Sequence, residues 1–462
     1  MKFDILVLGA GPGGYVAAIR AAQLGYSVAI IEKENLGGIC LNWGCIPTKA
    51  LLKSAQVYNY LKHTSDYGIE LEGSAKPNMD AIVTRSRGVA ENMSKGVQYL
   101  MKKNNVQVIE GRGKLLKDKK VEVELNGNKE VFEANHIILA TGARSRVLPN
   151  LPQDGKKIIG YREAMTLREQ PQSMLVVGSG AIGSEFAYFY QSIGTQVTLV
   201  EFMPTLVPNE DSEVASTLQR NFKKSGMKVY TSTSVERVDT SSDKCKVTIK
   251  GKKGEEIIEV DVVLSAVGVQ TNIENLGLEE LGVKTNGPKI EVDDFYRTNI
   301  EGVYAIGDIV HGPALAHVSS KEAIICIDAI HGLNPKPLSY DNVPGCTYTY
   351  PEIASVGLTE DKAKDLGKEI KVGKFMYMAS GKASASGNRD GFVKVVIDAN
   401  TDEMLGCHMI GDNVTEMIAE VVLARENKIN AHHILDAIHP HPTMSEAVME
   451  AIEAAYGKAI HG

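Results

Sequence analysis

The residues best suited to carry chemistry in this chain are two cysteines that lie close together. Cys40 and Cys45 belong to the segment GGICLNWGCIPTK (37–49), just downstream of the glycine-rich segment GAGPGG (9–14). A disulfide needs Cα atoms roughly 4.4–6.8 Å apart, whereas positions i and i+5 of a helix rise about 7.5 Å along the axis. A bond between the two cysteines therefore requires a distorted backbone, which we expect at Gly44 and at Ile46 before Pro47. Such a disulfide would be labile; the alternative is two unrelated buried thiols.

The glycine-rich segment belongs to a pattern that occurs twice. Each copy has an apolar strand, closely spaced glycines, a helix and a second strand that ends in a glutamate. The strands and glutamates are 3–8, 27–31 and Glu32 in the first copy, and 174–177, 196–200 and Glu201 in the second. The first glycine and the glutamate are 23 residues apart in both copies, from 9 to 32 and from 178 to 201. We therefore predict two βαβ units, each binding a dinucleotide.

Each glycine in this pattern has a mechanical task. The first permits a tight turn, the second lets the backbone approach a pyrophosphate, and the third lets helix and strand pack closely. These glycines are Gly9, Gly11 and Gly14 in the first copy, and Gly178, Gly180 and Gly183 in the second. Glu32 and Glu201 would accept hydrogen bonds from ribose hydroxyls. No arginine follows Glu201 to hold a 2′-phosphate, which favours NAD over NADP at the second site. The alternative for either motif is a glycine-rich turn in an α/β fold that binds no nucleotide.

Length and charge limit the functions open to the chain. Its 462 residues suggest about three domains. A net charge of −7 argues against nucleic-acid binding, and no stretch approaches the roughly 20 apolar residues of a membrane span. A strand begins directly after Met1 and Lys2, so we expect no targeting peptide and a cytoplasmic protein. A cysteine pair there suggests catalysis or metal binding, and metal is disfavoured because no second Cys/His cluster supplies ligands.

Further strands suggest how the domains are divided. The apolar segments 137–142 and 262–268 each end in a small-residue turn, and 298–308 ends in the carboxylate of Asp308. From about 345, strands and amphipathic helices follow without a nucleotide motif. We predict an α/β protein with two Rossmann-like domains and a C-terminal α+β domain, for which the family resemblance described below implies a role in dimerisation. The expected boundaries are 1–147 and 271–344 for the first nucleotide domain, 148–270 for the second, and 345–462 for the C-terminal dimerisation domain.

The motifs in this order resemble the flavoprotein disulfide reductases over essentially the whole chain. The resemblance adds the segments ATG (140–142), PEIASVG (351–357) and HPHPTMSE (439–446) to the glycine motifs and the cysteines. It implies FAD in the first site, NAD in the second, and a redox disulfide between Cys40 and Cys45. Cys40 would exchange with substrate, while Cys45 would lie against the flavin as the charge-transfer thiol.

The same resemblance implies roles for residues outside the cysteine pair. Those beside FAD would be Lys49, Thr141, Gly142, Asp308 and Ala316, and those at the NAD site Glu185, which would pair with Lys49, and Gly268. His441, held by Glu446 and supplied by the partner subunit, would be the acid/base, so that the active site exists only in a homodimer. Histidine titrates near neutrality, which suits this proton transfer. Glu446 also has a structural interpretation, because TMSE (443–446) is a capping box for a helix at 447–456.

The substrate expected from this resemblance is dihydrolipoamide on lipoyl carrier domains, with an acyltransferase core of a 2-oxo-acid dehydrogenase complex as a partner. Other disulfide reductases are the nearest alternatives. Glutathione reductases carry a second lysine at the position of Thr48 in this chain, and a basic NADP site at the position of Glu201. Mercuric and large thioredoxin reductases need a C-terminal redox pair, whereas the last cysteine here is Cys407. A non-catalytic docking protein is a further alternative. Departures from the family pattern are Ile39, Pro440, Val269 and Thr271, of which the last two bear on NAD binding.

Overall fold

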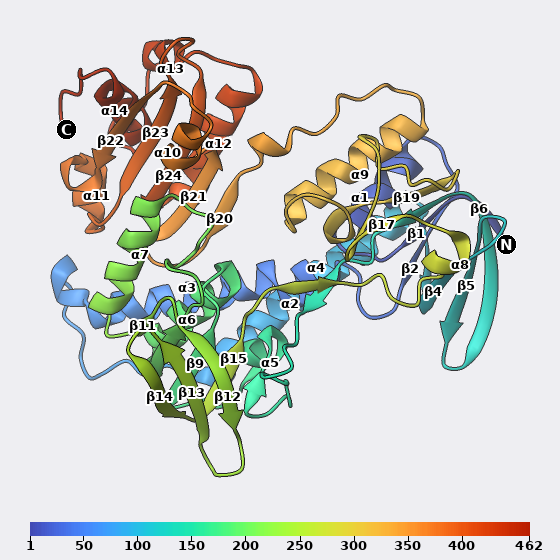
Figure 1. Ribbon diagram of the computed structural model, residues 1–462, viewed down its shortest axis with the longest axis horizontal. Helices are drawn as coiled ribbons and strands as arrows, with labels where there is room; N and C mark the ends of the chain where they lie inside the picture. Colours follow the sequence, from blue (N-terminus) through green and yellow to red (C-terminus); the bar gives the residue numbers. More distant parts are fainter. The chain divides into compact units, whose positions relative to one another are not determined.

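The computed structural model describes all 462 residues and divides them into two compact units. The first comprises residues 1–50, 81–146 and 268–338, and the second comprises 51–80, 147–267 and 339–462. Three of these divisions lie close to the boundaries expected after 147, 270 and 344. The separate assignment of 51–80 to the second unit was not anticipated, and the four-part division remains a prediction. Figure 1 shows the elements within each unit.

The first unit is built on a seven-stranded sheet. Strands β3, β2, β1 and β6 lie side by side in parallel, β19 also pairs with β6, and β6, β5 and β4 form an antiparallel meander. Their bounds are β1 (Lys2–Leu8), β2 (Val28–Glu32), β3 (Gln107–Glu110), β4 (Arg112–Leu116), β5 (Lys120–Leu125), β6 (Asn128–Leu139) and β19 (Val303–Ala305). The last four residues of β1, 5–8, are buried as a continuous apolar run, which is typical of a parallel strand covered on both faces.

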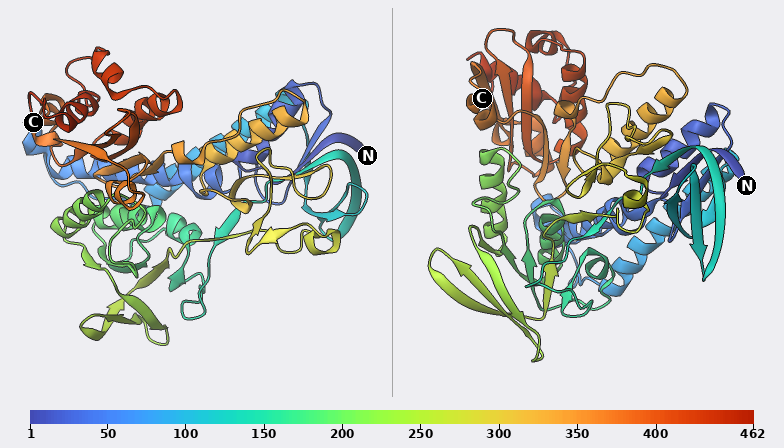
Figure 2. Two further views of the ribbon diagram at one scale, coloured as in Figure 1. Left: turned by 45° about the horizontal axis from the view of Figure 1, so that its top comes forward. Right: turned by 45° about the vertical axis from the view of Figure 1, so that its right-hand side comes forward.

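Helices α1 (Pro12–Gln23) and α9 (Ala316–Ile330) pack against each other in this unit (Figure 2). Ala17, Ala18 and Ala21 of α1 are fully buried, and these small side chains permit the close approach. Helix α1 ends at Gln23, with Leu24 as its cap and Gly25 at φ 91° after it. The remaining elements are α2 (Gly38–Trp43), α3 (Cys45–Lys62), η1 (Thr64–Tyr67), α4 (Met79–Lys103), β7 (Ala143–Ser145), β16 (Val269–Thr271), α8 (Leu278–Leu281), β17 (Thr285–Asn286), β18 (Lys289–Ile290) and η2 (Gly307–Ile309).

The second unit contains a five-stranded parallel sheet in the order β11-β10-β9-β15-β8. The order β11-β10-β9-β15 reproduces β3-β2-β1-β6, so the repeat predicted from the sequence is confirmed. A three-stranded antiparallel sheet, β12-β13-β14, follows. The bounds are β8 (Ile158–Ile159), α5 (Tyr161–Thr166), β9 (Ser173–Val177), α6 (Ala181–Ile193), β10 (Gln196–Val200), α7 (Ser212–Lys224), β11 (Lys228–Tyr230), β12 (Ser234–Asp239), β13 (Cys245–Gly251), β14 (Gly254–Val260) and β15 (Val262–Ser265).

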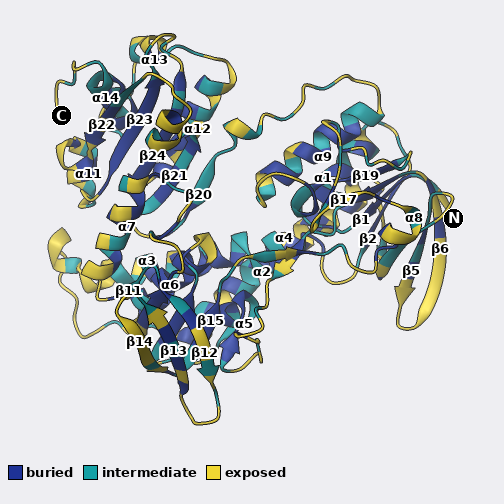
Figure 3. Ribbon diagram, in the orientation of Figure 1, coloured by how far each residue is buried: buried dark blue, intermediate teal, exposed yellow.

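The C-terminal part of this unit is α+β, as predicted. Its antiparallel sheet has the order β20-β21-β24-β23-β22, and α12 and α14 pack against it. Strand β23 is buried along nearly its whole length, as Figure 3 shows in dark blue. The bounds are η3 (Tyr340–Asn342), β20 (Gly345–Thr347), β21 (Glu352–Gly357), α10 (Glu360–Asp365), β22 (Ile370–Met376), η4 (Tyr377–Ala379), α11 (Gly381–Ser386), β23 (Phe392–Asp398), β24 (Met404–Gly411), α12 (Val414–Glu426), α13 (Ala431–Asp436) and α14 (Glu446–Ala455). None of the chain's helices combines the length and apolarity that crossing a membrane requires.

Candidate active site

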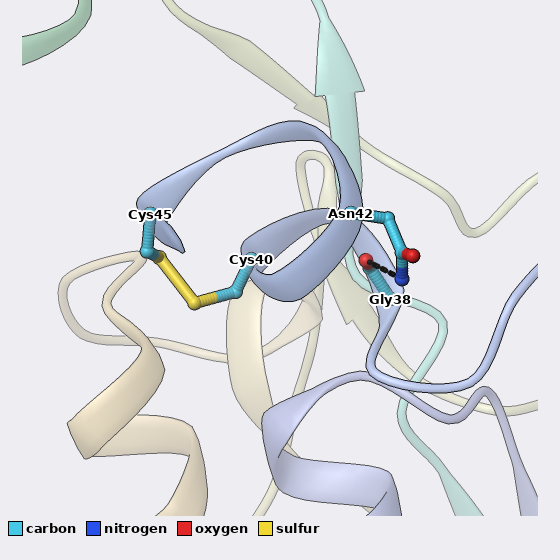
Figure 4. The surroundings of a disulfide bond; sticks show 4 residues. All are labelled: Gly38, Cys40, Asn42 and Cys45. Atoms are coloured by element: carbon cyan, nitrogen blue, oxygen red, sulfur yellow. Dashed lines mark hydrogen bonds between the residues drawn. A yellow bond between two sulfur atoms is a disulfide. The ribbon is translucent and has the colours of Figure 1, made fainter. Parts of the chain in front are cut away.

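Cys40 and Cys45 form a disulfide at the junction of two helices (Figure 4). Helix α2 ends at Trp43, α3 begins at Cys45, and Gly44 between them has φ −145° and ψ −111°. This break brings the two Cα atoms to 4.7 Å, which lies within the range that a disulfide requires. The prediction of a distorted backbone at Gly44 is therefore confirmed.

The predicted distortion before Pro47 is wrong. Ile46 and Pro47 both lie in the first turn of α3, which begins at Cys45. Proline is tolerated there because the first amides of a helix have no partner within it, and the fixed φ suits helical geometry. The helical path is therefore interrupted at Gly44 alone, and the second cysteine stands at the start of an unbroken helix.

The disulfide segment is attached to the first glycine motif. The amide of Gly37 donates a hydrogen bond to the carbonyl oxygen of Ala10 at 2.8 Å. A Cβ atom at Gly38 would lie only 2.6 Å from the Cα atom of Gly11, so only glycine allows this approach. The side-chain amide of Asn42 also holds the segment, since its Nδ2 donates to the carbonyls of Leu36 and Gly38 at 3.0 and 2.9 Å. The segment that carries the two cysteines is thus attached at its start to the predicted phosphate loop.

The first glycine motif has the geometry of a dinucleotide cradle. Gly9 has φ 100°, and a Cβ atom at Gly14 would lie 1.8 Å from the carbonyl oxygen of Gly9. By contrast, a Cβ atom at Gly11 would meet no atom within 4 Å. The open space at Gly11 is where a pyrophosphate would approach the backbone. Glu32 closes the site, because its Oε2 accepts a hydrogen bond from the amide of Ala10 at 2.8 Å.

The second glycine motif repeats this geometry. Gly178 has φ 94°, a Cβ atom at Gly183 would lie 1.9 Å from the carbonyl oxygen of Gly178, and one at Gly180 would meet nothing within 4 Å. The Oε2 atom of Glu201 accepts hydrogen bonds from the amide and the hydroxyl of Ser179, both at 2.7 Å. The sites therefore fit two dinucleotides in equivalent orientations, each with its glutamate beside the loop.

The other residues expected beside FAD lie in the first unit. Thr141 is held by Asn272, with hydrogen bonds of 2.7 and 3.0 Å in the two directions, and Gly142 has φ 68°. Asp308 lies in η2, where burial raises the pKa of its carboxyl against the opposing charge of Lys289. Ala316 is the first residue of α9.

Helix α9 and η2 are brought to the first glycine motif through Gly13. A Cβ atom at Gly13 would lie 2.2 Å from the hydroxyl of Ser319 in α9 and 3.2 Å from the side chain of Ile306. The strand expected to end at Asp308 is shorter than predicted: β19 ends at Ala305, and Asp308 follows in η2. The segment after β19 and the N-terminal part of α9 lie next to the same loop, and contact of Asp308 and Ala316 with a dinucleotide stays a prediction.

The remaining residues expected at the NAD site are found on both units. Gly268 has φ 99°, and Glu185 is buried in α6, where its Oε1 accepts a hydrogen bond from the amide of Tyr348 at 3.0 Å. Lys49 is half-buried in α3. The predicted pairing of Lys49 with Glu185 and the effect of Val269 and Thr271 on NAD stay predictions.

His441 and Glu446 form a hydrogen-bonded pair in the C-terminal domain. The Nδ1 atom of His441 lies 2.8 Å from Oε1 of Glu446, and the other carboxylate oxygen accepts from the amide of Thr443 at 2.8 Å. Burial opposes ionisation of Glu446, but these two hydrogen bonds outweigh it and hold the pKa of this carboxyl below its usual range. The imidazole side chain is 77% exposed and its carboxylate partner 26% exposed. The dyad therefore presents an oriented imidazole at the surface.

The predicted capping box at 443–446 forms only in part. Glu446 does accept from the amide of Thr443, but the Thr443 hydroxyl donates to the carbonyl of Pro440 at 2.8 Å. Helix α14 begins at Glu446, with Ser445 as its cap, so Glu446 is the first helical residue and not the third. The loop before the helix is therefore fixed by Glu446 itself, and this carboxylate serves both the loop and His441.

A second histidine in this loop has a structural environment. The side chain of His439 is 6% exposed, its Nε2 lies 2.8 Å from Oε1 of Glu420, and its Nδ1 lies 3.1 Å from the carbonyl oxygen of Ala437. Both ring nitrogens are thus engaged within the protein. His439 anchors the loop, and His441 two residues later is left exposed.

Two nucleotide cradles and a disulfide attached to one of them define a flavin- and pyridine-nucleotide-linked reductase. Comparison with models of known protein families agrees with this class. The chain belongs to the pyridine nucleotide-disulphide oxidoreductase family, whose model matches residues 3–323, while residues 343–452 match the dimerisation domain of that family.

Among full-length relatives, the chain is 47% identical to dihydrolipoyl dehydrogenase of Rhizobium etli, covering 100% of this chain and 99% of the relative. It is 42% identical to dihydrolipoyl dehydrogenase of Bacillus subtilis, with the same coverage. The structure is similar to LpdA from Mycobacterium tuberculosis (TM-score 0.91, 27% identity, 98% of this chain and 99% of that one). It also resembles the HOCl-induced flavoprotein disulfide reductase RclA from Escherichia coli (TM-score 0.88, 25% identity, 98% and 99%).

Several residues that build the site escaped the sequence analysis. Ser179 holds Glu201, and Asn272 holds Thr141. Ser179 occupies the variable position after the first glycine of its motif. When a glutamate ends the next strand, a hydroxyl at this position could have predicted a hydrogen bond to that glutamate. Asn272 is 131 residues from Thr141 and has no local pattern that would reveal it.

Proposed function

We propose that this chain oxidises dihydrolipoamide to lipoamide and transfers the two electrons to NAD. The observation that carries the proposal is the attachment of the Cys40–Cys45 segment to the first dinucleotide loop, through Gly37 and Gly38. A dithiol substrate and a disulfide of the protein exchange electrons without a metal or an external oxidant. The identity of the relatives as dihydrolipoyl dehydrogenases supports this substrate over other dithiols.

The protein's own groups account for the thiol–disulfide step. A substrate thiolate attacks the sulfur of Cys40, the Cys40–Cys45 bond breaks, and Cys45 leaves as a thiolate. The second substrate thiol then attacks the substrate sulfur of this mixed disulfide, which closes and releases lipoamide, and Cys40 leaves as a thiolate. His441 takes the proton of this second thiol, and Glu446 orients the imidazole and stabilises its charged form.

The residues that would hold FAD are those of the first cradle, Glu32, Thr141, Gly142, Asp308 and Ala316, with Lys49 beside its reactive ring. Those that would hold NAD are the glycines of the second motif, Glu185, Glu201 and Gly268. FAD, when bound, relays two electrons from the dithiol to NAD. The protein supplies orientation: Gly11 and Gly180 leave open the space that each pyrophosphate needs.

The active site is completed in a homodimer, with His441 supplied by the partner subunit. The exposure of the imidazole supports this arrangement, because a catalytic base of a single chain would be expected to face its own cleft. The dimerisation domain contains the dyad on α14 and the loop before it. The proposed partners are lipoyl carrier domains and the acyltransferase core of a 2-oxo-acid dehydrogenase complex, in the cytoplasm, where reducing conditions suit a disulfide that is reduced in every turnover.

The substrate is tested with the purified holoprotein. We expect anaerobic dihydrolipoamide to reduce the protein and, with NAD, to give steady NADH formation. Glutathione disulfide with NADPH should be turned over at least 100-fold more slowly. Equal or faster turnover of glutathione disulfide would overturn the assignment.

The shared active site is tested with a mixed dimer. Cys40→Ser and His441→Gln subunits carrying different tags are co-expressed, and the heterodimer is isolated. If His441 acts across the dimer, one of its two sites is intact and about half of the wild-type activity returns. If each chain supplies its own His441, the heterodimer is as inactive as either homodimer.

A further inference from the structure

One helix holds the backbone of the disulfide segment by four side chains. Helix α4 runs beside this segment, and its donors reach carbonyl oxygens on both sides of the two cysteines. The hydrogen bonds are Ser94 Oγ to Leu36 (2.9 Å), Arg87 Nη1 to Asn42, Ser86 Oγ to Pro47 (2.8 Å) and Arg85 Nη1 to Ala50 (2.7 Å). Side-chain hydrogen bonds to main-chain carbonyls fix the path of a backbone that regular structure does not fix. The segment that closes the disulfide is thus held to α4 as well as to the first nucleotide loop.

Arg87 differs from the other three donors because it reaches into the stretch between the cysteines. Its acceptor, Asn42, lies in the last turn of α2, where carbonyl oxygens have no partner within the helix. A cation at this end also interacts favourably with the helix dipole. Arg87 therefore caps α2 one residue before Trp43, and Gly44 and Cys45 follow directly.

The same guanidinium stacks on the only tryptophan of the chain. The Cζ atom of Arg87 lies 4.2 Å from the ring centroid of Trp43. This is cation–π geometry, which is stronger where the partners are shielded from water. Arg87 is half-buried, and burial lowers the pKa of its guanidinium from the ordinary value. Arginine nevertheless remains charged at neutral pH, so a fixed positive charge lies against one of the four residues between Cys40 and Cys45.

We propose that the charge of Arg87 favours the reduced state of the Cys40–Cys45 pair. The oxidised pair is neutral, whereas reduction leaves a thiolate on Cys45. A cation held on Asn42 and Trp43, in the stretch between the two cysteines, interacts favourably only with the charged form, and only such a difference between states shifts an equilibrium. The stacking on Trp43 and the bond to Asn42 keep the cation in place through both states. The proposal rests on the proposed redox role of the cysteines and not on the identity of the dithiol substrate.

The direct test is the thiol–disulfide equilibrium of the holoprotein. The protein is equilibrated with defined ratios of reduced and oxidised dithiothreitol, and Cys40 and Cys45 are trapped by alkylation and quantified by mass spectrometry. Arg87→Met keeps the length of the side chain and removes its charge. We expect the equilibrium constant for reduction to fall about three- to tenfold, where tenfold corresponds to about 30 mV. Because no lipoamide is present, failure of the proposed substrate would leave this measurement intact.

Two further variants separate charge from mere support of the fold. Arg87→Lys retains the cation and should recover most of the shift, while Lys95→Met removes an exposed cation from the same helix and should leave the equilibrium unchanged. If Arg87→Met is poorly folded, Trp43→Leu, which removes the stacking surface, should shift the equilibrium in the same direction. A wild-type equilibrium in Arg87→Met, or equal shifts in Arg87→Met and Arg87→Lys, would overturn the proposal.

Discussion

The carboxylate of Glu201 accepts both the amide and the hydroxyl hydrogen bond of Ser179, at 2.7 Å each. Glu201 is buried, so these bonds are shielded from water. Its second oxygen accepts from the amide of Met203 at 2.7 Å, which fixes the plane of the carboxylate. We infer that a glutamate held in this way repels a 2′-phosphate and offers its one remaining lone pair to a ribose hydroxyl. On this proposal, cofactor choice is coupled to the conformation of the glycine loop.

Replacing Glu201 should weaken the preference for NAD. Glu201→Ala removes the ribose acceptor and the repulsion of a 2′-phosphate, so we expect KM for NAD to rise about tenfold, as expected for one charge-assisted hydrogen bond, and the NAD/NADP ratio of kcat/KM to fall. Glu201→Gln is the matched variant, since it keeps one oxygen as an acceptor for Ser179 while it removes the charge and replaces the oxygen that accepts from the Met203 amide with an NH2 group. Unchanged discrimination in both variants would contradict the ribose contact.

Two glycines of one motif should give opposite results when changed to alanine. Gly180→Ala places its methyl group in open space, so the protein should fold normally while the pyrophosphate loses its approach and KM for NAD rises at least tenfold. Gly183→Ala places the methyl group 1.9 Å from the carbonyl oxygen of Gly178, and the backbone must move. We expect a loss of stability of about 1–3 kcal/mol, as for other overpacked sites.

Thermal unfolding and NAD titration of the two alanine variants separate these effects. A destabilised Gly180→Ala protein with normal NAD affinity would refute the assignment of an open phosphate site.

The sequence was most informative where function depends on local pattern. Both glycine motifs, Glu32, Glu201 and the cysteine pair lie within short segments, and their geometry follows from backbone rules that act over a few residues. The contacts of Arg87 could not be predicted, because it meets Asn42 across 45 residues through a side chain whose type alone indicates a solvated helix face.

The errors at Pro47 and Thr443 have a related cause. Each prediction applied a local sequence rule to the residue alone. In the folded protein a neighbouring element changed the outcome. Helix α3 begins early enough to place Pro47 in its first turn, and Pro440 provides the acceptor that takes the Thr443 hydroxyl. The pairing of His441 with Glu446 was accessible from the sequence through the resemblance, whereas the exposure of the imidazole was not.

The two cysteines should differ when each is changed to serine. Cys40→Ser should abolish lipoamide turnover and leave a lone thiolate at Cys45, which we expect to give the bound flavin a long-wavelength absorption band. Cys45→Ser, the matched variant, should also be inactive but lack the band. Normal lipoamide activity in Cys40→Ser, or the same spectrum in both variants, would contradict the unequal roles.

Removing the charge of Glu446 should change the pH dependence of stability and slow turnover. Because hydrogen bonds hold its pKa below the ordinary value of about 4.3, the ionised carboxylate contributes stability that is complete above that value and is lost as the pH falls through the lowered pKa. Unfolding measured from pH 6 to pH 3 should therefore show an advantage of wild type over Glu446→Gln that disappears at the acid end. Turnover of dihydrolipoamide at neutral pH should also fall, because the imidazolium that forms when His441 takes a proton loses the carboxylate that holds and stabilises it. Glu453→Gln, on the same helix, should change neither the stability profile nor the turnover, and wild-type turnover in Glu446→Gln would show that this carboxylate serves only the loop.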